Sequence, residues 1–129
     1  MPTPFDQIAG LNKLIHEPAR LAIMTALSSC SSADFLFLQR LTGLTKGNLS
    51  AHLSRLEREE FVQIDKTFIG KKPYTFVSLT SVGERQIERH WTLLEQLRNG
   101  AQQWKPERGE VSRKALLKAA VPRKDEGKG

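Results

Sequence analysis

The stretch that decides the fold is Leu41–Val62, LTGLTKGNLSAHLSRLEREEFV, in which a tight connection is followed by a one-sided apolar pattern. Residues 42–44 supply the connection. The hydroxyl of Thr45 is placed to cap a following helix by accepting hydrogen bonds from its first free backbone N–H groups. A new helix is therefore predicted to begin near Lys46.

The apolar residues of this helix are spaced for a single buried face. Leu49, Leu53 and Leu56 fall at i, i+4 and i+7, so they lie on one side of the helix. The remaining side chains are small, polar or basic, and can reach base edges and phosphates without filling a DNA groove. They are Lys46, Asn48, Ser50, Ala51, His52, Ser54 and Arg55. The segment predicts a helix-turn-helix whose second helix enters DNA.

Helices are predicted on the N-terminal side of this motif. A first short helix before Pro18 is indicated by apolar residues at three- and four-residue steps, namely Phe5, Ile8, Leu11, Leu14 and Ile15. Pro18 suits the first turn of a second helix, which ends in the Ser28–Ser32 cluster. Ala33 and Asp34 are expected to pair as a very short strand, and the next helix over residues 35–41 leads into the motif.

On the C-terminal side the period changes from helical to alternating. Val62, Ile64 and Lys66 share one side of an extended segment, and residues 74–79 form a second β-rich run. The polar residues 70–73 between them predict the turn of an antiparallel hairpin, whose tip has Lys71 and Lys72. Thr80 then caps a long helix with an apolar stripe at Ile87, Trp91, Leu94 and Leu97, which is expected to end at Asn99 and Gly100.

The composition is that of a single globular domain followed by a basic tail. The chain has 129 residues, 39% of them hydrophobic, and a formal charge of +6. From Lys105 onward eight basic residues face four acidic ones, so the tail has +4 and the rest of the chain only +2. We expect residues 1–100 to form the domain. Residues 101–129 are expected to be a mobile tail with at most one marginal helix near Ala115–Val121.

Several classes of protein are disfavoured by what the sequence contains. No apolar run approaches the length of a membrane span, and the N-terminus lacks a signal segment, so a cytoplasmic protein is expected. Cys30 is the single cysteine, which leaves no internal disulfide or cysteine pair for zinc. No nucleophile, base and orienting group occur in motif context, so neither an enzyme nor a bound metal or cofactor is predicted.

In order, these pieces resemble a winged helix-turn-helix domain of the MarR/ArsR superfamily, in particular its small single-domain transcriptional regulators. The resemblance covers about two-thirds of the chain. It rests on HEPARLAIMTAL at 16–27, DFLFLQRLTGLTKGNLSAHLSRLEREEFVQI at 34–64, GKKPYTFVSLT at 70–80, and Gly83. It implies a mainly helical α+β fold, with a three-helix core, a β-hairpin wing, and N- and C-terminal helices that build a dimer.

The resemblance also implies which residues face DNA. The second helix of the motif would lie in the major groove and the wing would touch the flanking backbone or minor groove. Carried over by position, the DNA-facing residues are Thr45, Lys46, Asn48, Ser50, Ala51, His52 and Arg55, with Lys71 and Lys72 in the wing. Many relatives have arginine in the wing. Lysine lacks the planar fork of arginine, so phosphate contact is the role predicted for this wing.

Each of these residues also has a simpler interpretation. The helix residues can form a solvated face, with His52 packed against a neighbouring element, and the two wing lysines can serve only solubility. His16 and His90 are expected to pack or hydrogen-bond rather than bind metal. Trp91 and Trp104 suit the core or a subunit interface better than an effector pocket.

The function predicted from the sequence is a sequence-specific, double-stranded DNA-binding transcriptional regulator that acts as a homodimer. Two recognition helices related by a twofold axis read two half-sites and so multiply discrimination. An effector is expected to bind between subunits, unless the protein responds only to its own concentration. The alternative is a winged-helix protein–protein interaction module that binds no DNA.

Overall fold

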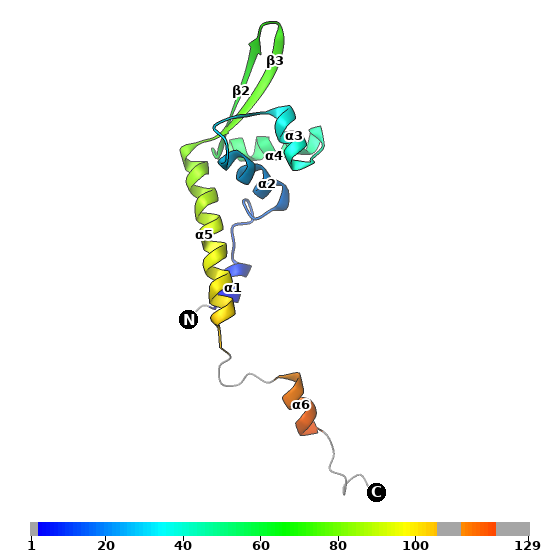
Figure 1. Ribbon diagram of the computed structural model, residues 1–129, viewed down its shortest axis with the longest axis vertical. Coiled ribbons are helices and arrows are strands. Elements are labelled where there is room, and N and C mark those ends of the chain that lie inside the picture. The colour runs from blue at the N-terminus through cyan, green and yellow to red at the C-terminus, as the bar shows by residue number, and fades with distance from the viewer. Residues whose placement is uncertain (1–2, 106–111, 121–129) are drawn as a thin grey trace, which may run out of the picture.

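Figure 1 shows the chain as a computed structural model, which describes residues 3–105 and 112–120. The elements follow in the order α1 (Pro4–Ala9), α2 (Pro18–Ser28), β1 (Ala33–Asp34), α3 (Phe35–Thr42), α4 (Lys46–Arg58), β2 (Val62–Ile69), β3 (Lys72–Leu79), α5 (Ser81–Gln103) and α6 (Arg113–Ala120). The predicted fold is confirmed: it is a mainly helical α+β fold with a three-helix core and a β-hairpin wing.

The core lies between α2, α3 and α4 and is closed by the base of the sheet and the start of α5. Its fully buried side chains include Ile23, Met24, Leu27, Leu38, Leu49, Leu56, Val77 and Ile87. Each large apolar side chain removed from water in this way contributes about 1.5–3 kcal/mol to folding. The leucine stripe of α4 is therefore firmly anchored, which fixes the rotation of that helix about its axis.

β3 is the central strand of a small antiparallel sheet with the order β1-β3-β2. The short strand at Ala33 and Asp34 is present, as the sequence predicted, and this strand, β1, pairs with β3 through Ala33 opposite Val77. The β2–β3 hairpin pairs from Val62 opposite Leu79 to its far end at Ile69 opposite Lys72. Only the base of this hairpin is covered by the core, and its outer half projects from the domain (Figure 1).

The turn of the hairpin is shorter than expected. The predicted four-residue turn 70–73 is wrong, because Lys72 and Pro73 belong to β3 and only Gly70 and Lys71 connect the strands. Gly70 has a φ of +65°, a left-handed conformation that glycine adopts without the steric cost of a Cβ atom. A tight two-residue turn is thereby possible, and the hairpin extends further from the core.

The first helix is also shorter than the apolar spacing predicted. α1 ends at Ala9, where the N–H of Gly10 donates to the carbonyls of Asp6 and Gln7. The following segment turns back on itself, with the side chain of Asn12 accepting from the N–H of Leu14 at 2.9 Å. Leu11 and Ile15 are nevertheless buried. Their spacing correctly predicted that they are buried. The predicted helix, however, is present only as far as residue 9.

The long helix α5 continues beyond its predicted end at Asn99 and Gly100. It runs to Gln103 with Gly100 inside it. A Cβ atom at Gly100 would lie 3.2 Å from Cγ of Pro4, so this glycine serves the close packing of α1 on α5 rather than a helix end. Figure 1 shows α1 beside the C-terminal half of α5.

Only part of the expected tail belongs to the described residues. Within it, residues 101–103 continue α5, and the expected short helix is present as α6, all of whose side chains are exposed. Residues 106–111 and 121–129, on which the prediction of mobility mainly rests, lie outside the described part of the chain. None of the helices described is long and apolar enough to cross a membrane.

Candidate DNA interface

The junction between α3 and α4 has the local geometry that the sequence predicted. Gly43 ends α3 in the left-handed conformation, with a φ of +71°. Thr45 then has extended backbone, and its Oγ1 accepts from the N–H of Asn48 at 3.1 Å. The cap satisfies one of the free donors of the first turn and starts α4 at Lys46. The turn and the second helix of the motif are therefore confirmed as structure.

The exposed face of α4 is the face opposite its leucines. Leu49, Leu53 and Leu56 are 0%, 2% and 0% exposed. Thr45, Lys46, Asn48, Ser50, Ala51, Ser54 and Arg55 are all exposed, whereas His52 is half-buried. The structure thus brings the predicted DNA-facing residues of the motif together on one surface, which we call the α4 surface.

A groove separates the α4 surface from the wing. Its volume is about 940 Å³. It is lined by the basic residues Lys46, Lys66 and Lys72, by the hydroxyls of Ser50, Ser54, Tyr74 and Thr75, and by the carboxylates of Asp34 and Glu57. Three cations against two anions leave the lining with one net positive charge.

Sequence reasoning undervalued Lys66, which lines this groove although it was not among the predicted DNA-facing residues. The alternation of β2 contained the necessary signal. Lys66 shares a strand face with Val62, which is buried, and Ile64, which packs on the core. A side chain on that face, one step beyond the edge of the core, must point toward α4.

The wing tip presents both cations and apolar side chains. Lys71 and Lys72 are exposed, as predicted. Phe68 and Ile69 beside them are 70% and 59% exposed, which the sequence analysis did not anticipate. Tyr74 stacks on Phe76 at 5.9 Å between ring centroids on the outer part of β3.

His52 is tied to the start of α2. Its Nδ1 lies 3.2 Å from Nη1 of Arg20 and 3.4 Å from Oε2 of Glu17. Glu17 and Arg20 also contact each other at 3.4 Å. His52 thus packs against a neighbouring element, which is one of the two interpretations that its sequence position allows. Nothing in the local sequence marks Glu17 or Arg20 as neighbours of α4.

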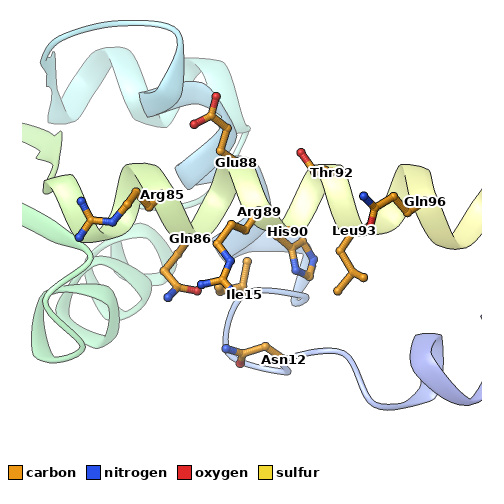
Figure 2. A pocket seen from close by; sticks show the side chains of 10 residues that line it. All are labelled: Asn12, Ile15, Arg85, Gln86, Glu88, Arg89, His90, Thr92, Leu93 and Gln96. Atoms are coloured by element: carbon orange, nitrogen blue, oxygen red, sulfur yellow. The ribbon is translucent and has the colours of Figure 1, made fainter. Parts of the chain in front are cut away.

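A second hollow, of about 730 Å³, lies away from α4 between α5 and the segment before α2. Figure 2 shows Arg89 and His90 projecting from α5 toward the segment that contains Asn12 and Ile15. At its edge Nδ1 of His16 lies 3.0 Å from Nε2 of His90, so the two histidines do hydrogen-bond. Within residues 3–105 and 112–120, no group of three or more His, Cys, Asp or Glu side chains is arranged to hold a metal ion.

The remaining singled-out side chains have structural roles. Cys30 is half-buried, with its thiol directed at the carbonyl of Ala26 at 3.6 Å. Nε1 of Trp91 donates to Oγ1 of Thr25 at 3.0 Å. Trp104 meets Phe5 edge to face at 5.4 Å, which joins the end of α5 to α1.

Comparison with known proteins identifies the family. Residues 19–98 match the winged helix DNA-binding domain family, so the chain belongs to this family. An uncharacterized protein of Methanocaldococcus jannaschii is 31% identical over 71 residues, which span 55% of this chain and 77% of that protein.

Solved structures agree with this assignment. A transcriptional regulator homologue from Pyrococcus horikoshii is 31% identical, with a TM-score of 0.69 over 76% of this chain and 96% of that one. A MarR family transcriptional regulator from Silicibacter pomeroyi shares the fold at 18% identity, with a TM-score of 0.55 over 89% and 69% of the two chains. The predicted class, a winged-helix DNA-binding domain with MarR-like structural neighbours, is confirmed.

Proposed function

We propose that this protein is a sequence-specific, double-stranded DNA-binding transcriptional regulator that acts as a homodimer through its outer helices. The observation that supports it most is the position of the α4 surface beside a lysine-lined groove and a projecting wing. A helix and a neighbouring hairpin arranged in this way match a major groove, the sugar-phosphate ridge beside it, and the next minor groove.

The side chains of the α4 surface suit base readout and close approach. Asn48 can pair with adenine through both amide atoms, and Arg55 can pair with guanine or hold a phosphate. Ala51 and Gly47 add no bulk where the helix must come nearest to the bases. The hydroxyl of Ser50 is suited to a phosphate oxygen.

The groove lysines suit the phosphate ridge. Lys66 of β2 and Lys72 of β3 face Lys46 of α4 across the hollow, so a backbone running between helix and wing meets ammonium groups from both sides. Asp34 and Glu57 offset part of this charge. The groove therefore contributes positioning and moderate affinity, and discrimination depends on the bases.

The outer helices leave apolar surface available for a second protomer. The stripe on α5 is covered within the protomer at Ile87 and Leu97, whereas Trp91 is 42% exposed. Exposed apolar groups remain on Phe5, Ile8 and Trp104, where α1 packs on the end of α5. A twofold pairing at this end would bury them and place two α4 helices on one side of a duplex.

Selection of bound duplexes from a random pool tests the proposal. The wild-type chain is expected to enrich a motif with two related half-sites. Asn48→Ala is expected to relax preference at one position in each half-site and to cost about 1–3 kcal/mol on the selected duplex. Arg98→Ala, an exposed cation on α5, is the control and should leave the motif unchanged. A protein-interaction module without DNA binding would enrich no motif.

A further inference from the structure

His52 lies on the flank of the α4 surface, and within residues 3–105 and 112–120 only one of its ring nitrogens has a partner. Nδ1 faces Nη1 of Arg20 at 3.2 Å and Oε2 of Glu17 at 3.4 Å. Each partner also forms a hydrogen bond with the backbone. Glu17 caps α2 by accepting from the N–H of Ala19 at 2.7 Å. Nε of Arg20 donates to the carbonyl of Leu14 at 2.6 Å.

The contact with Arg20 favours one position of the proton on the neutral ring. A guanidinium has only donors, so a hydrogen of Arg20 Nη1 directed at Nδ1 requires a lone pair there. The neutral ring of His52 then bears its hydrogen on Nε2. The other neutral form would set two N–H groups against each other at 3.2 Å. In the imidazolium both nitrogens bear hydrogens, and the charged ring forms an ion pair with Glu17, whose Oε2 lies 3.4 Å from Nδ1.

Nε2 of His52 is open to solvent. In the partly or fully buried side chains of the described residues, one nitrogen or oxygen atom is shielded from solvent and also lacks a hydrogen-bond partner, and this atom is Oε2 of Glu17. Nε2 of His52 also lacks a hydrogen-bond partner within the described part of the chain. Because Nε2 is not that shielded atom, it must be accessible to solvent. The ring thus presents a single N–H donor at the edge of the α4 surface.

We propose that His52 contacts DNA as a hydrogen-bond donor through Nε2, and that Glu17 and Arg20 are positioning residues that fix this polarity. The inference rests on the proposed DNA-binding function. The atoms it fits are acceptors: a phosphate oxygen, N7 of a purine or O6 of guanine. The amino groups of adenine and cytosine are donors and do not fit.

The polarity of the ring is tested without DNA. The full chain, labelled with ¹⁵N in its histidine rings, has three histidines, and His52→Leu identifies the signals of residue 52. At a pH where the ring is neutral, Nε2 is expected to show the shift of a protonated nitrogen and Nδ1 that of an unprotonated one. Arg20→Lys, which keeps the charge but loses the planar fork, is expected to mix the two forms. A hydrogen on Nδ1 in the wild-type chain would overturn the inference.

The contact itself is tested on a duplex selected by the wild-type protein. His52→Leu is expected to weaken binding about tenfold, as for one lost hydrogen bond at a polar interface. His52→Gln should retain most of the affinity, because its amide places a donor near the position of Nε2. Equal losses in both variants would show that the donor is not used.

Modified duplexes then separate the two kinds of acceptor. Replacement of single purines by 7-deaza analogues removes N7, replacement of single guanines by 2-aminopurine removes O6, and single methylphosphonates neutralise one phosphate. One such change in the duplex is expected to weaken binding by the wild-type protein but not to weaken binding by His52→Leu any further. The same change should still weaken binding by Arg55→Ala. A response to the purine series assigns a base contact, and a response to the phosphate series assigns a backbone contact. Additive effects at every position would refute the contact. If the wild-type chain selected no duplex, the proposed function would fail while the ring-polarity result stood.

Discussion

Nδ1 of His16 lies 3.0 Å from Nε2 of His90, so two imidazole rings join the segment before α2 to the long helix α5. His90 is buried, and its burial lowers the pKa of the ring below the ordinary 6.5, with the charge of a protonated His16 lowering it further. As the pH falls through 6.5, the unfolded chain takes up a proton at His90 before the folded protein does. The contribution of His90 to the free energy of unfolding therefore falls as the pH falls below 6.5.

This pH dependence is expected to disappear in His90→Gln, which keeps a polar side chain but has no titrating ring. Urea denaturation at pH 7.5 and pH 5.5 measures it. The wild-type chain should lose more stability between the two pH values than His90→Gln does. Carboxylates titrate in both proteins and cancel in the comparison. Equal losses would show that the histidine pair does not couple to folding.

Gly83 lies at the start of α5 under the connection between α4 and β2. A Cβ atom there would lie 2.0 Å from the backbone oxygen of Phe61, which itself accepts from the N–H of Thr80 at 3.0 Å. Gly83→Ala is therefore expected to reduce the free energy of unfolding by about 3 kcal/mol, because backbone has to shift. Gly47→Ala is the matched control.

Gly47 lies in α4, where an added Cβ atom meets nothing within 4 Å. Its replacement by alanine should stabilise the helix by about 0.5–1 kcal/mol. Thermal or urea unfolding of both variants measures the contrast. A mild effect at Gly83 would show that the close approach of α5 to Phe61 is not needed for folding.

Lys66 is expected to act on DNA through charge alone. Lys66→Ala should weaken binding about equally on selected and unrelated duplexes, and should lower the slope of log K against log salt by about 1. Asn48→Ala should do the opposite, with a loss confined to the selected duplex and an unchanged slope. Fluorescence anisotropy at several salt concentrations measures both. A sequence-dependent loss in Lys66→Ala would place this lysine at a base instead.

We expect the basic tail to make a second contribution to the slope of log K against log salt. Residues 105–129 have a net charge of +4, which favours counterion release from any duplex. A chain that ends at Trp104 should show a flatter salt dependence and the same selected motif. An unchanged slope would reject a role of the tail in binding, and a changed motif would give the tail a part in readout.

Most of the fold was predictable because its signals are local. The leucine stripe of α4, the cap at Thr45 and the alternation of β2 each need only a few neighbouring residues. Two errors arose where distant residues contribute: Gly100 lies inside α5 where Pro4 packs on it, and Leu11 and Ile15 are buried without being helical. The error in the turn was local, since Lys72 and Pro73 already belong to β3.

The candidate site divides in the same way. Exposure of the α4 surface follows from the burial of its leucines, so those residues were identified before the structure was known. The orientation of the His52 ring depends on Arg20, thirty-two positions away, and no local pattern reveals it. Contacts of the α4 and wing residues with DNA stay predictions.

Ile8 tests the proposed dimer most directly. Its side chain on α1 is exposed within the protomer, so a charge there should leave folding intact but oppose burial against a second copy. The wild-type protein is expected to scatter light with twice the mass of its 14.5 kDa chain at micromolar concentration. Ile8→Glu should shift it toward the single mass and lower the affinity for a two-half-site duplex more than for one half-site.

Leu36→Glu, an exposed apolar residue on α3, is the matched control and should leave the mass unchanged. A wild-type protein with the mass of one chain would contradict the dimer, and dissociation by Leu36→Glu but not Ile8→Glu would move the interface from the outer helices to α3.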